Sequence, residues 1–280
     1  MSLDELVARG GVLVLSGAGL STESGIPDYR GPTGAARPAT PMTYQVFTGS
    51  AQARQRYWAR SHLGWRVIAR AQPNTGHLAI ADLQRAGLLR GVVTQNVDGL
   101  HTAAGAREVV ELHGALDKVV CLSCGDRSTR DDLDVRLTVA NPGWRDHDVV
   151  SRPDGDVDLD EVSGFDVVDC VLCGGVLKPD VVFFGETVPR DRVDHCFALL
   201  DSASALLVLG SSLTVMSGYR FVLKASKAGV PVALVNQGPT RGDAQATVRV
   251  DAPLGEVLTG LRNRLLGASL VRSGDDLRGG

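Results

Sequence analysis

Four of the five cysteines form two C-x-x-C pairs, Cys121 with Cys124 and Cys170 with Cys173. Each pair can present two thiolates to one metal ion, and zinc prefers four thiolates in a tetrahedron. The gap between the pairs is longer than the roughly 15–20 residues of a compact zinc ribbon. Four thiolates leave no open position on the metal, so the pattern predicts one structural zinc ion; a redox-active C-x-x-C is the alternative. Cys196 stands alone and is expected to be a small buried apolar residue.

A glycine-rich turn, Gly17-Ala18-Gly19, follows a short apolar run near the N-terminus. Glycines at such a place let the backbone turn tightly and approach a pyrophosphate, which the start of a helix then stabilises. The third glycine of a G-x-G-x-x-G fingerprint is absent, because Thr22 occupies its position. By this motif alone, a purely structural turn is nearly as well supported as a dinucleotide site.

The polar loop after this turn ends in an acid, an aromatic ring and a guanidinium, at Asp28, Tyr29 and Arg30. Arg30 can pair with a phosphate through two hydrogen bonds. Tyr29 can cover a flat ring, and Asp28 can accept from a ribose hydroxyl or hold the loop. These side chains favour the nucleotide interpretation of the preceding turn.

Polar side chains also follow two later apolar runs. Gln95, Asn96 and Asp98 are poor strand residues at the end of a predicted strand, where open α/β sheets bind ligands. They suit recognition of an amide such as nicotinamide, although a strand-end turn that caps a helix explains them as well. His113 follows the next strand, and an ordinary histidine pKa of about 6.5 suits a general base. A lone histidine is nevertheless more often structural than catalytic.

Short apolar runs alternate with helix-like stretches along the chain. The runs end in Gly, Ser or Asn, as buried parallel strands with loops at their carboxyl ends do. Amphipathic stretches predict helices over 75–86, 193–203 and 219–228. The alternation predicts an α/β fold with a Rossmann-like, doubly wound parallel sheet. The expected strands are 12–15, 92–94, 109–112, 181–184, 205–209 and 230–235.

Two segments interrupt this alternation and are expected to form a smaller domain. Residues 36–75 are predicted to be a helical insertion, and residues 115–179, with both cysteine pairs, a zinc-binding module. The tail over 266–280 is rich in Gly, Ser and Asp and is expected to be flexible. The Rossmann-like domain then comprises residues 1–35, 76–114 and 180–265.

The composition excludes several classes of protein. A chain of 280 residues with 44% hydrophobic residues can bury a full core without disulfides and is not disordered. A net charge of −3 argues against a partner that is nucleic acid or an anionic membrane, because phosphate binding draws on a basic excess. No apolar run approaches the roughly 18 residues needed to span a bilayer. The first residues show no signal or transit pattern, so we expect a cytoplasmic protein.

Taken together, these motifs resemble those of the sirtuins, the NAD-dependent protein-lysine deacylases, from about residue 10 to about residue 262. The segments 54–60 and 238–241 and the long zinc-module insertion look like the class II branch of that family. The motifs that carry the resemblance are GAGLSTESGIPDYR at 17–30, TQNVDGLH at 94–101, LHG at 112–114, both cysteine pairs, LKPDVVFFGE at 177–186 and GSS at 210–212.

The resemblance implies that NAD is a consumed co-substrate bound between the two domains, and that the zinc is structural. It implies catalytic roles for His113, as the general base, and for Asn96. It further implies an acyl-lysine protein or peptide substrate, which pairs as an added strand with the stretch around Val181 and Phe183. The residues implied to bind NAD are Gly17, Ala18, Gly19, Thr22, Asp28, Tyr29, Arg30, Gln95, Asn96, Asp98, Gly210, Ser211, Ser212, Asn236, Gln237, Gly238 and Leu254.

The reaction implied by the resemblance is deacylation, and other activities stay open beside it. A protein ADP-ribosyltransferase or a lipoamidase-type deacylase would use the same site. A dehydrogenase would need a complete G-x-G-x-x-G and an acid about 20 residues further on. Tyr57 and Arg60 have the spacing of a pair that binds acidic acyl groups, although a helix-face tyrosine and a solvated arginine explain them at least as well.

Overall fold

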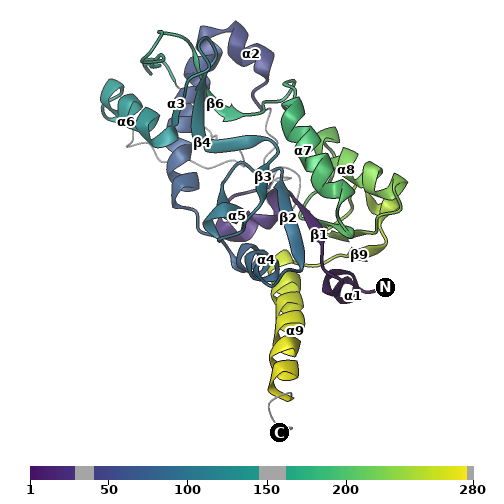
Figure 1. Cartoon of the computed structure of the whole chain (residues 1–280). Helices are drawn as coiled ribbons and strands as arrows, with labels where there is room; N and C mark the ends of the chain where they lie inside the picture. The colour runs from purple at the N-terminus through teal and green to yellow at the C-terminus, as the bar shows by residue number, and fades with distance from the viewer. Residues whose placement is uncertain (29–40, 145–161, 276–280) are drawn as a thin grey trace.

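Six parallel strands form the central sheet of the molecule (Figure 1). The computed structural model describes residues 1–28, 41–144 and 162–275. The strands of the central sheet are β1 (Val12–Ser16), β2 (Leu89–Thr94), β3 (Val109–Glu111), β7 (Ala205–Leu209), β8 (Val232–Val235) and β9 (Val248–Val250).

The strand order, β3-β2-β1-β7-β8-β9, reverses direction at β1. From β1 the chain builds outward to β2 and β3 on one side, and β7, β8 and β9 complete the other side. This order confirms the predicted doubly wound sheet. Ligands of such sheets bind beyond the carboxyl ends of the strands at the reversal, which here is the crevice between β1 and β7.

Helices cover both faces of this sheet, because side chains alternate along each strand. Val12 and Val14 of β1 share one core with α1 (Leu3–Ala8), α4 (Thr75–Arg85) and α9 (Leu254–Asp275). Leu13 and Leu15 share the opposite core with α7 (Arg190–Asp201) and α8 (Met216–Lys227). The three predicted helices are thus confirmed, although α7 and α8 each begin earlier than the sequence suggested.

A second, smaller unit lies beside the carboxyl edge of the sheet, at the top of the view in Figure 1. Its antiparallel sheet has the order β5-β4-β6. Helices from the first insertion and the cysteine-bearing segment pack on one shared apolar core around Trp58, Val119 and Leu133. The elements are α2 (Tyr44–Gly49), α3 (Ala51–Arg70), β4 (Gly114–Cys121), β5 (Arg127–Thr129), α6 (Arg130–Ala140) and β6 (Leu177–Val181).

One predicted strand is wrong. The run 181–184 was expected in the parallel sheet, but Val181 ends β6, which pairs antiparallel with β4. An apolar run has the same pattern in either sheet, so its composition could not place it. α9 continues to Asp275, into the segment predicted as a tail, and the predicted domain boundaries stay predictions. The remaining helices are α5 (Leu100–Ala103) and the short 3-10 turns η1 (Ala18–Leu20), η2 (Thr22–Ser24) and η4 (Asp243–Gln245).

Across the three described ranges, none of the helices has both the length and the apolar character that a membrane crossing requires.

Candidate active site

A cavity of about 960 Å³ lies at the carboxyl edge of the parallel sheet. Loops after β1, β2, β7 and β8 form one side of it, and the end of β6 forms another. Tyr29 and Arg30 lie outside the described residues. All the other residues predicted to bind NAD line this cavity: Gly17, Ala18, Gly19, Thr22, Asp28, Gln95, Asn96, Asp98, Gly210, Ser211, Ser212, Asn236, Gln237, Gly238 and Leu254. Their roles toward NAD stay predictions.

The turns after β1 and β7, which both line the cavity, touch each other. The Gly19 N–H donates to the Gly210 carbonyl at 2.9 Å. A Cβ atom on Gly17 would lie 2.8 Å from that carbonyl oxygen, and one on Gly19 would lie 2.9 Å from it. Gly210 itself has a φ of +60°, which favours glycine. The glycines are therefore required for the contact between the two turns, and the same turns line the cavity.

A chain of buried hydrogen bonds joins the loops after β1 and β2. The Asn96 amide Nδ2 donates to the Gly17 carbonyl at 3.1 Å and contacts the Ser21 hydroxyl at 2.9 Å. Ser21 donates to Asp98 Oδ2 at 2.7 Å. The other Asp98 oxygen accepts from the Leu100 N–H at 3.0 Å and so caps α5. Asp98 thus bonds the first N–H of α5, as the helix-capping interpretation expects, and Gln95, Asn96 and Asp98 line the cavity. Their recognition of nicotinamide stays a prediction.

Ser21 was not among the predicted site residues. It lies inside the motif at 17–30, so its position between predicted residues was the available signal.

His113 is held through both ring nitrogens. Nδ1 lies 2.9 Å from the Gln95 carbonyl oxygen, and Nε2 lies 2.8 Å from the Ser217 hydroxyl. Burial lowers the pKa of His113; the Gln95 carbonyl opposes this shift, and the cations Arg192 and Arg220 add to it. The ring is therefore neutral near pH 7, the state that a general base requires.

The base also sits where the chain passes from one sheet to the other. His113 lies between β3 and β4, and its carbonyl accepts from the Val182 N–H at 2.7 Å. Ser217 and Arg220 of α8 line the same cavity but were not predicted. They lie on a helix face, without the glycine or cysteine spacing that identified the other residues.

The wall that was predicted to pair with a peptide is built on a buried lysine. The Lys178 ammonium lies 2.9 Å from a Glu186 oxygen, and it also donates to the Pro179 and Val181 carbonyls. Glu186 accepts from the Phe183 N–H at 2.9 Å. Lys178 is therefore linked to both ends of the segment that carries Val181 and Phe183, which both line the cavity.

Tyr57 lines the cavity beside Phe183, with ring centroids 5.2 Å apart. Arg60 is not among the described lining residues. A role for Arg60 in binding acidic acyl groups therefore stays a hypothesis.

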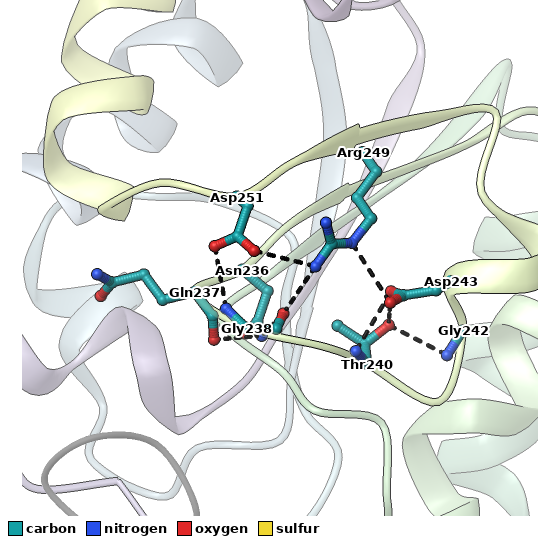
Figure 2. Close-up of polar contacts among 8 residues, drawn as sticks. All are labelled: Asn236, Gln237, Gly238, Thr240, Gly242, Asp243, Arg249 and Asp251. Atoms are coloured by element: carbon teal, nitrogen blue, oxygen red, sulfur yellow. Dashed lines mark hydrogen bonds and ion pairs between the residues drawn. The ribbon is translucent and has the colours of Figure 1, made fainter.

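The loop after β8 is held by Arg249 of β9 and by Asp251, the residue that follows this strand (Figure 2). Asp251 accepts from the Gly238 N–H at 3.0 Å, and Arg249 donates to the Gly238 carbonyl at 3.2 Å. Arg249 also pairs with Asp251 at 3.1 Å and with Asp243 at 3.3 Å. The N–H and the carbonyl of Gly238, a residue that lines the cavity, are thus held by Asp251 and Arg249.

The four paired cysteines converge at one point in the small unit, with all four sulfurs within 4.8 Å of one another. The Cys121 and Cys173 sulfurs are 3.5 Å apart, and those of Cys124 and Cys170 are 3.8 Å apart. Sulfurs bound tetrahedrally to zinc at about 2.3 Å lie roughly 3.8 Å from one another, so the donors fit zinc. They are too far apart for disulfides, whose sulfurs are about 2.05 Å apart.

Cys196, the fifth cysteine, lies on α7 and is fully buried in the core that this helix shares with the parallel sheet. Burial raises the pKa of its thiol to about 11. Its predicted role as a small apolar residue is confirmed.

Known proteins match this chain over most of its length. The model of the Sir2 family matches residues 17–217. NAD-dependent protein deacetylase 1 of Streptomyces coelicolor is 62% identical over 93% of this chain and 88% of its own length. An NAD-dependent protein deacetylase of Xanthomonas campestris pv. campestris is 50% identical over 93% of this chain and 90% of its own length.

Solved structures agree with the sequence matches. A Sir2 structure with a p53 peptide and NAD+ has a TM-score of 0.74 and 30% identity, and covers 93% of this chain and 95% of its own. A Sir2 homologue with ADP-ribose has a TM-score of 0.76 and 29% identity, and covers 95% and 96% of the two chains. The family model, the relatives and the fold agree with the cavity and the cysteine site, and the chain therefore belongs to the Sir2 family.

Proposed function

We propose that this protein is an NAD-dependent protein-lysine deacetylase that releases nicotinamide, the free lysine and O-acetyl-ADP-ribose. The observation that carries the proposal is a neutral, doubly held His113 in the same cavity as the predicted NAD-binding turns. The two relatives reported above, named as NAD-dependent protein deacetylases, support the same activity. Assignment to the class II branch stays a prediction.

NAD fits along the carboxyl edge of the sheet. The loop at 236–238 would take the adenosine end, and the turns after β1 and β7 would take the pyrophosphate. Asn96 and Asp98 would face the nicotinamide, with Asn96 fixed by its bonds to Gly17 and Ser21. A site in which these amides and carboxylates are already hydrogen-bonded loses little conformational entropy when the ligand binds.

The acyl-lysine substrate would enter beside the stretch 181–184. An extended peptide adds to exposed strand backbone through main-chain hydrogen bonds, whatever its side chains. Val181 and Phe183 line the cavity, and Phe184 is 40% exposed at its rim. The acyl oxygen would then reach C1′ of the nicotinamide ribose as the bond to nicotinamide breaks.

His113 completes the reaction as a base. Its unprotonated nitrogen takes the proton of a ribose hydroxyl, whose oxygen attacks the carbon of the alkylated acyl group. Water then releases lysine and leaves the acetyl group on ADP-ribose. Enclosure by the two units limits access of water to the cationic centre, which prevents simple hydrolysis of NAD.

Zinc bound by the four cysteines would stabilise the fold without taking part in the chemistry, because the shell would be complete. The four cysteines are free thiols, and thiols stay reduced and available to a metal in a reducing compartment. We therefore place the protein in the cytoplasm.

The test is a panel of acetyl-, succinyl- and glutaryl-lysine peptides incubated with NAD and analysed by mass spectrometry. We expect the acetyl peptide to lose its acyl group and the same group to appear on ADP-ribose, in equal amounts. His113→Ala should abolish both products. His195→Ala, which alters an exposed histidine on α7, is the matched control and should retain them.

Transfer of ADP-ribose to the protein or peptide, without acyl loss, would replace this proposal with ADP-ribosylation. Full turnover by His113→Ala would remove the role assigned to the base.

A further inference from the structure

We propose that Ser217 is a positioning residue for the catalytic base, and that its hydroxyl holds the place that the ribose hydroxyl of NAD takes in the complex. The proposal rests on the proposed function for its catalytic meaning. Its geometric basis is the 2.8 Å contact between the Ser217 hydroxyl and Nε2 of His113. Both residues line the cavity.

The contact of Nδ1 with Gln95 shows which partner donates in the hydrogen bond between Ser217 and Nε2. The Gln95 carbonyl, 2.9 Å from Nδ1, can only accept a hydrogen bond, so Nδ1 carries the proton. In the neutral ring Nε2 then has only its lone pair. Ser217 must therefore donate to Nε2, the same lone pair that takes the proton of the ribose hydroxyl during catalysis.

Gln95 fixes both halves of this arrangement. Its carbonyl holds Nδ1 of His113, and its side-chain oxygen packs against the start of α8. A Cβ atom on Gly218 would lie 2.4 Å from that oxygen. Gly218 follows Ser217 in the first turn of α8, so the contact sets the position of the serine. The imidazole is held between the Gln95 carbonyl and the Ser217 hydroxyl. Gln95 contacts both sides of this arrangement, through its backbone and through its side chain.

The surrounding charges favour the same neutral state of the ring. Arg192 on α7 and Arg220 on α8 are the charged side chains that act on His113, and both disfavour the imidazolium. The Nε atom of Arg220 is buried and has no hydrogen-bond partner within the described part of the chain. The Ser217 hydroxyl donates to the bare nitrogen of the neutral ring and can rotate to accept from the protonated nitrogen, and the hydrogen bond to the charged ring is the stronger of the two. Loss of the hydroxyl should therefore lower the pKa of His113 further.

The experiment compares Ser217→Ala and Ser217→Thr with the unmodified enzyme. The first measurement is the pH titration of the His113 ring nitrogens by ¹⁵N NMR in the protein without NAD. We expect Ser217→Ala to lower the pKa of His113 by about half a unit to one unit, the equivalent of one hydrogen bond. Ser217→Thr keeps the hydroxyl and should restore the original value. Ser226→Ala, an exposed serine on the same helix, is the matched control.

Kinetics then test the replacement by the ribose hydroxyl. The profile of kcat/KM for NAD reports the free enzyme, whereas that of kcat reports the complex. The acid limb of kcat/KM should move to lower pH in Ser217→Ala. The acid limb of kcat should not move, because in the complex the ribose hydroxyl has replaced Ser217 at Nε2. A purely structural serine would lower activity without moving either limb.

An unchanged His113 titration in Ser217→Ala would overturn the proposal, as would a Thr variant that behaves like the Ala variant. An equal shift in both kinetic profiles would overturn the claim that the ribose hydroxyl replaces Ser217. The NMR titration needs no turnover. Its failure is therefore distinguishable from failure of the deacetylase assignment, which would appear as missing products with an intact titration shift.

Discussion

At the scale of single residues, Gly17 shows how little space separates the turns after β1 and β7. Its φ of −135° and ψ of −176° are open to any residue, so backbone strain does not require glycine there. Space does, because a Cβ atom would lie 2.8 Å from both the Gly210 oxygen and Cβ of Ser211. The constraint comes from the opposite turn and acts on the path that a pyrophosphate would follow.

Gly17→Ala should therefore separate the two turns. Overpacking of this kind costs about 1–3 kcal/mol, so we expect NAD affinity, measured by calorimetry, to fall roughly tenfold or more. Gly49→Ala is the control, because a Cβ atom there meets open space. Equal NAD affinity in the two variants would show that the contact between the turns does not shape the site.

The sequence identified the residues at strand ends that line the cavity. Gly17, Asn96 and His113 were predictable because glycine, amide and imidazole side chains interrupt apolar runs at a fixed point of an α/β fold. Ser217 was not, because a serine in the first turn of an amphipathic helix is an ordinary residue. Its proximity to Nε2 depends on how α8 packs on Gln95, which no local pattern encodes.

At the scale of elements, the short strand β9 and the residue after it hold the loop that follows β8. The network of Arg249, Asp243 and Asp251 in Figure 2 fixes both polar groups of Gly238. Arg249→Gln should loosen this loop and raise KM for NAD roughly two- to fivefold, as expected for partly exposed ion pairs. KM for the acyl peptide should stay the same.

The control is Arg190→Gln, which removes an exposed ion pair on α7. Steady-state kinetics would measure both KM values in each variant. Parallel changes in the two KM values of Arg249→Gln would contradict a local role for β9.

The end of β6 depends in the same way on Lys178, whose side chain is only 3% exposed. Lys178→Met leaves Glu186 and the neighbouring carbonyls without their donor, at a cost of about 1–3 kcal/mol. We expect KM for the acyl peptide to rise while NAD affinity, measured by calorimetry, holds. Lys178→Arg keeps the charge and should retain part of the peptide affinity. The control is Lys224→Met, which removes an exposed ion pair and should change neither quantity. A loss confined to NAD binding in Lys178→Met would contradict the proposal that the stretch with Val181 and Phe183 binds the peptide.

Elements differed in how well the sequence predicted them. β1, β7 and β8 are buried on both faces, and such strands give continuous apolar runs. β9, with the sequence Val-Arg-Val, gives too short a signal. The run at 181–184 was misplaced because burial against the small unit and burial in the parallel sheet select the same residue types. Only long-range pairing with β4 distinguishes the two, and pairing is not a local property.

At the scale of the whole molecule, the cavity is closed by two units that have separate cores. One wall comes from the parallel sheet, whereas Val181 and Phe183 belong to the core of the small unit. The cysteine cluster belongs to the same small unit, at the end of β4 that is far from Gly114 in the strand. The stability of the cysteine site is therefore linked, through β4 and β6, to the shape of the cavity wall that carries Val181 and Phe183.

Cys121→Ser tests this linkage. Loss of one thiolate should abolish stoichiometric zinc binding, measured by elemental analysis, because structural zinc contributes directly to folding free energy. The Tm should fall by several degrees, at about 2–4 °C per kcal/mol for a chain of this size. Peptide turnover should fall with it, although no cysteine of the cluster lines the cavity. Cys196→Ala should keep one zinc per chain. Unchanged zinc content and Tm in Cys121→Ser would contradict a structural metal site. Loss of zinc with full peptide turnover would contradict the link between the cysteine site and the cavity wall.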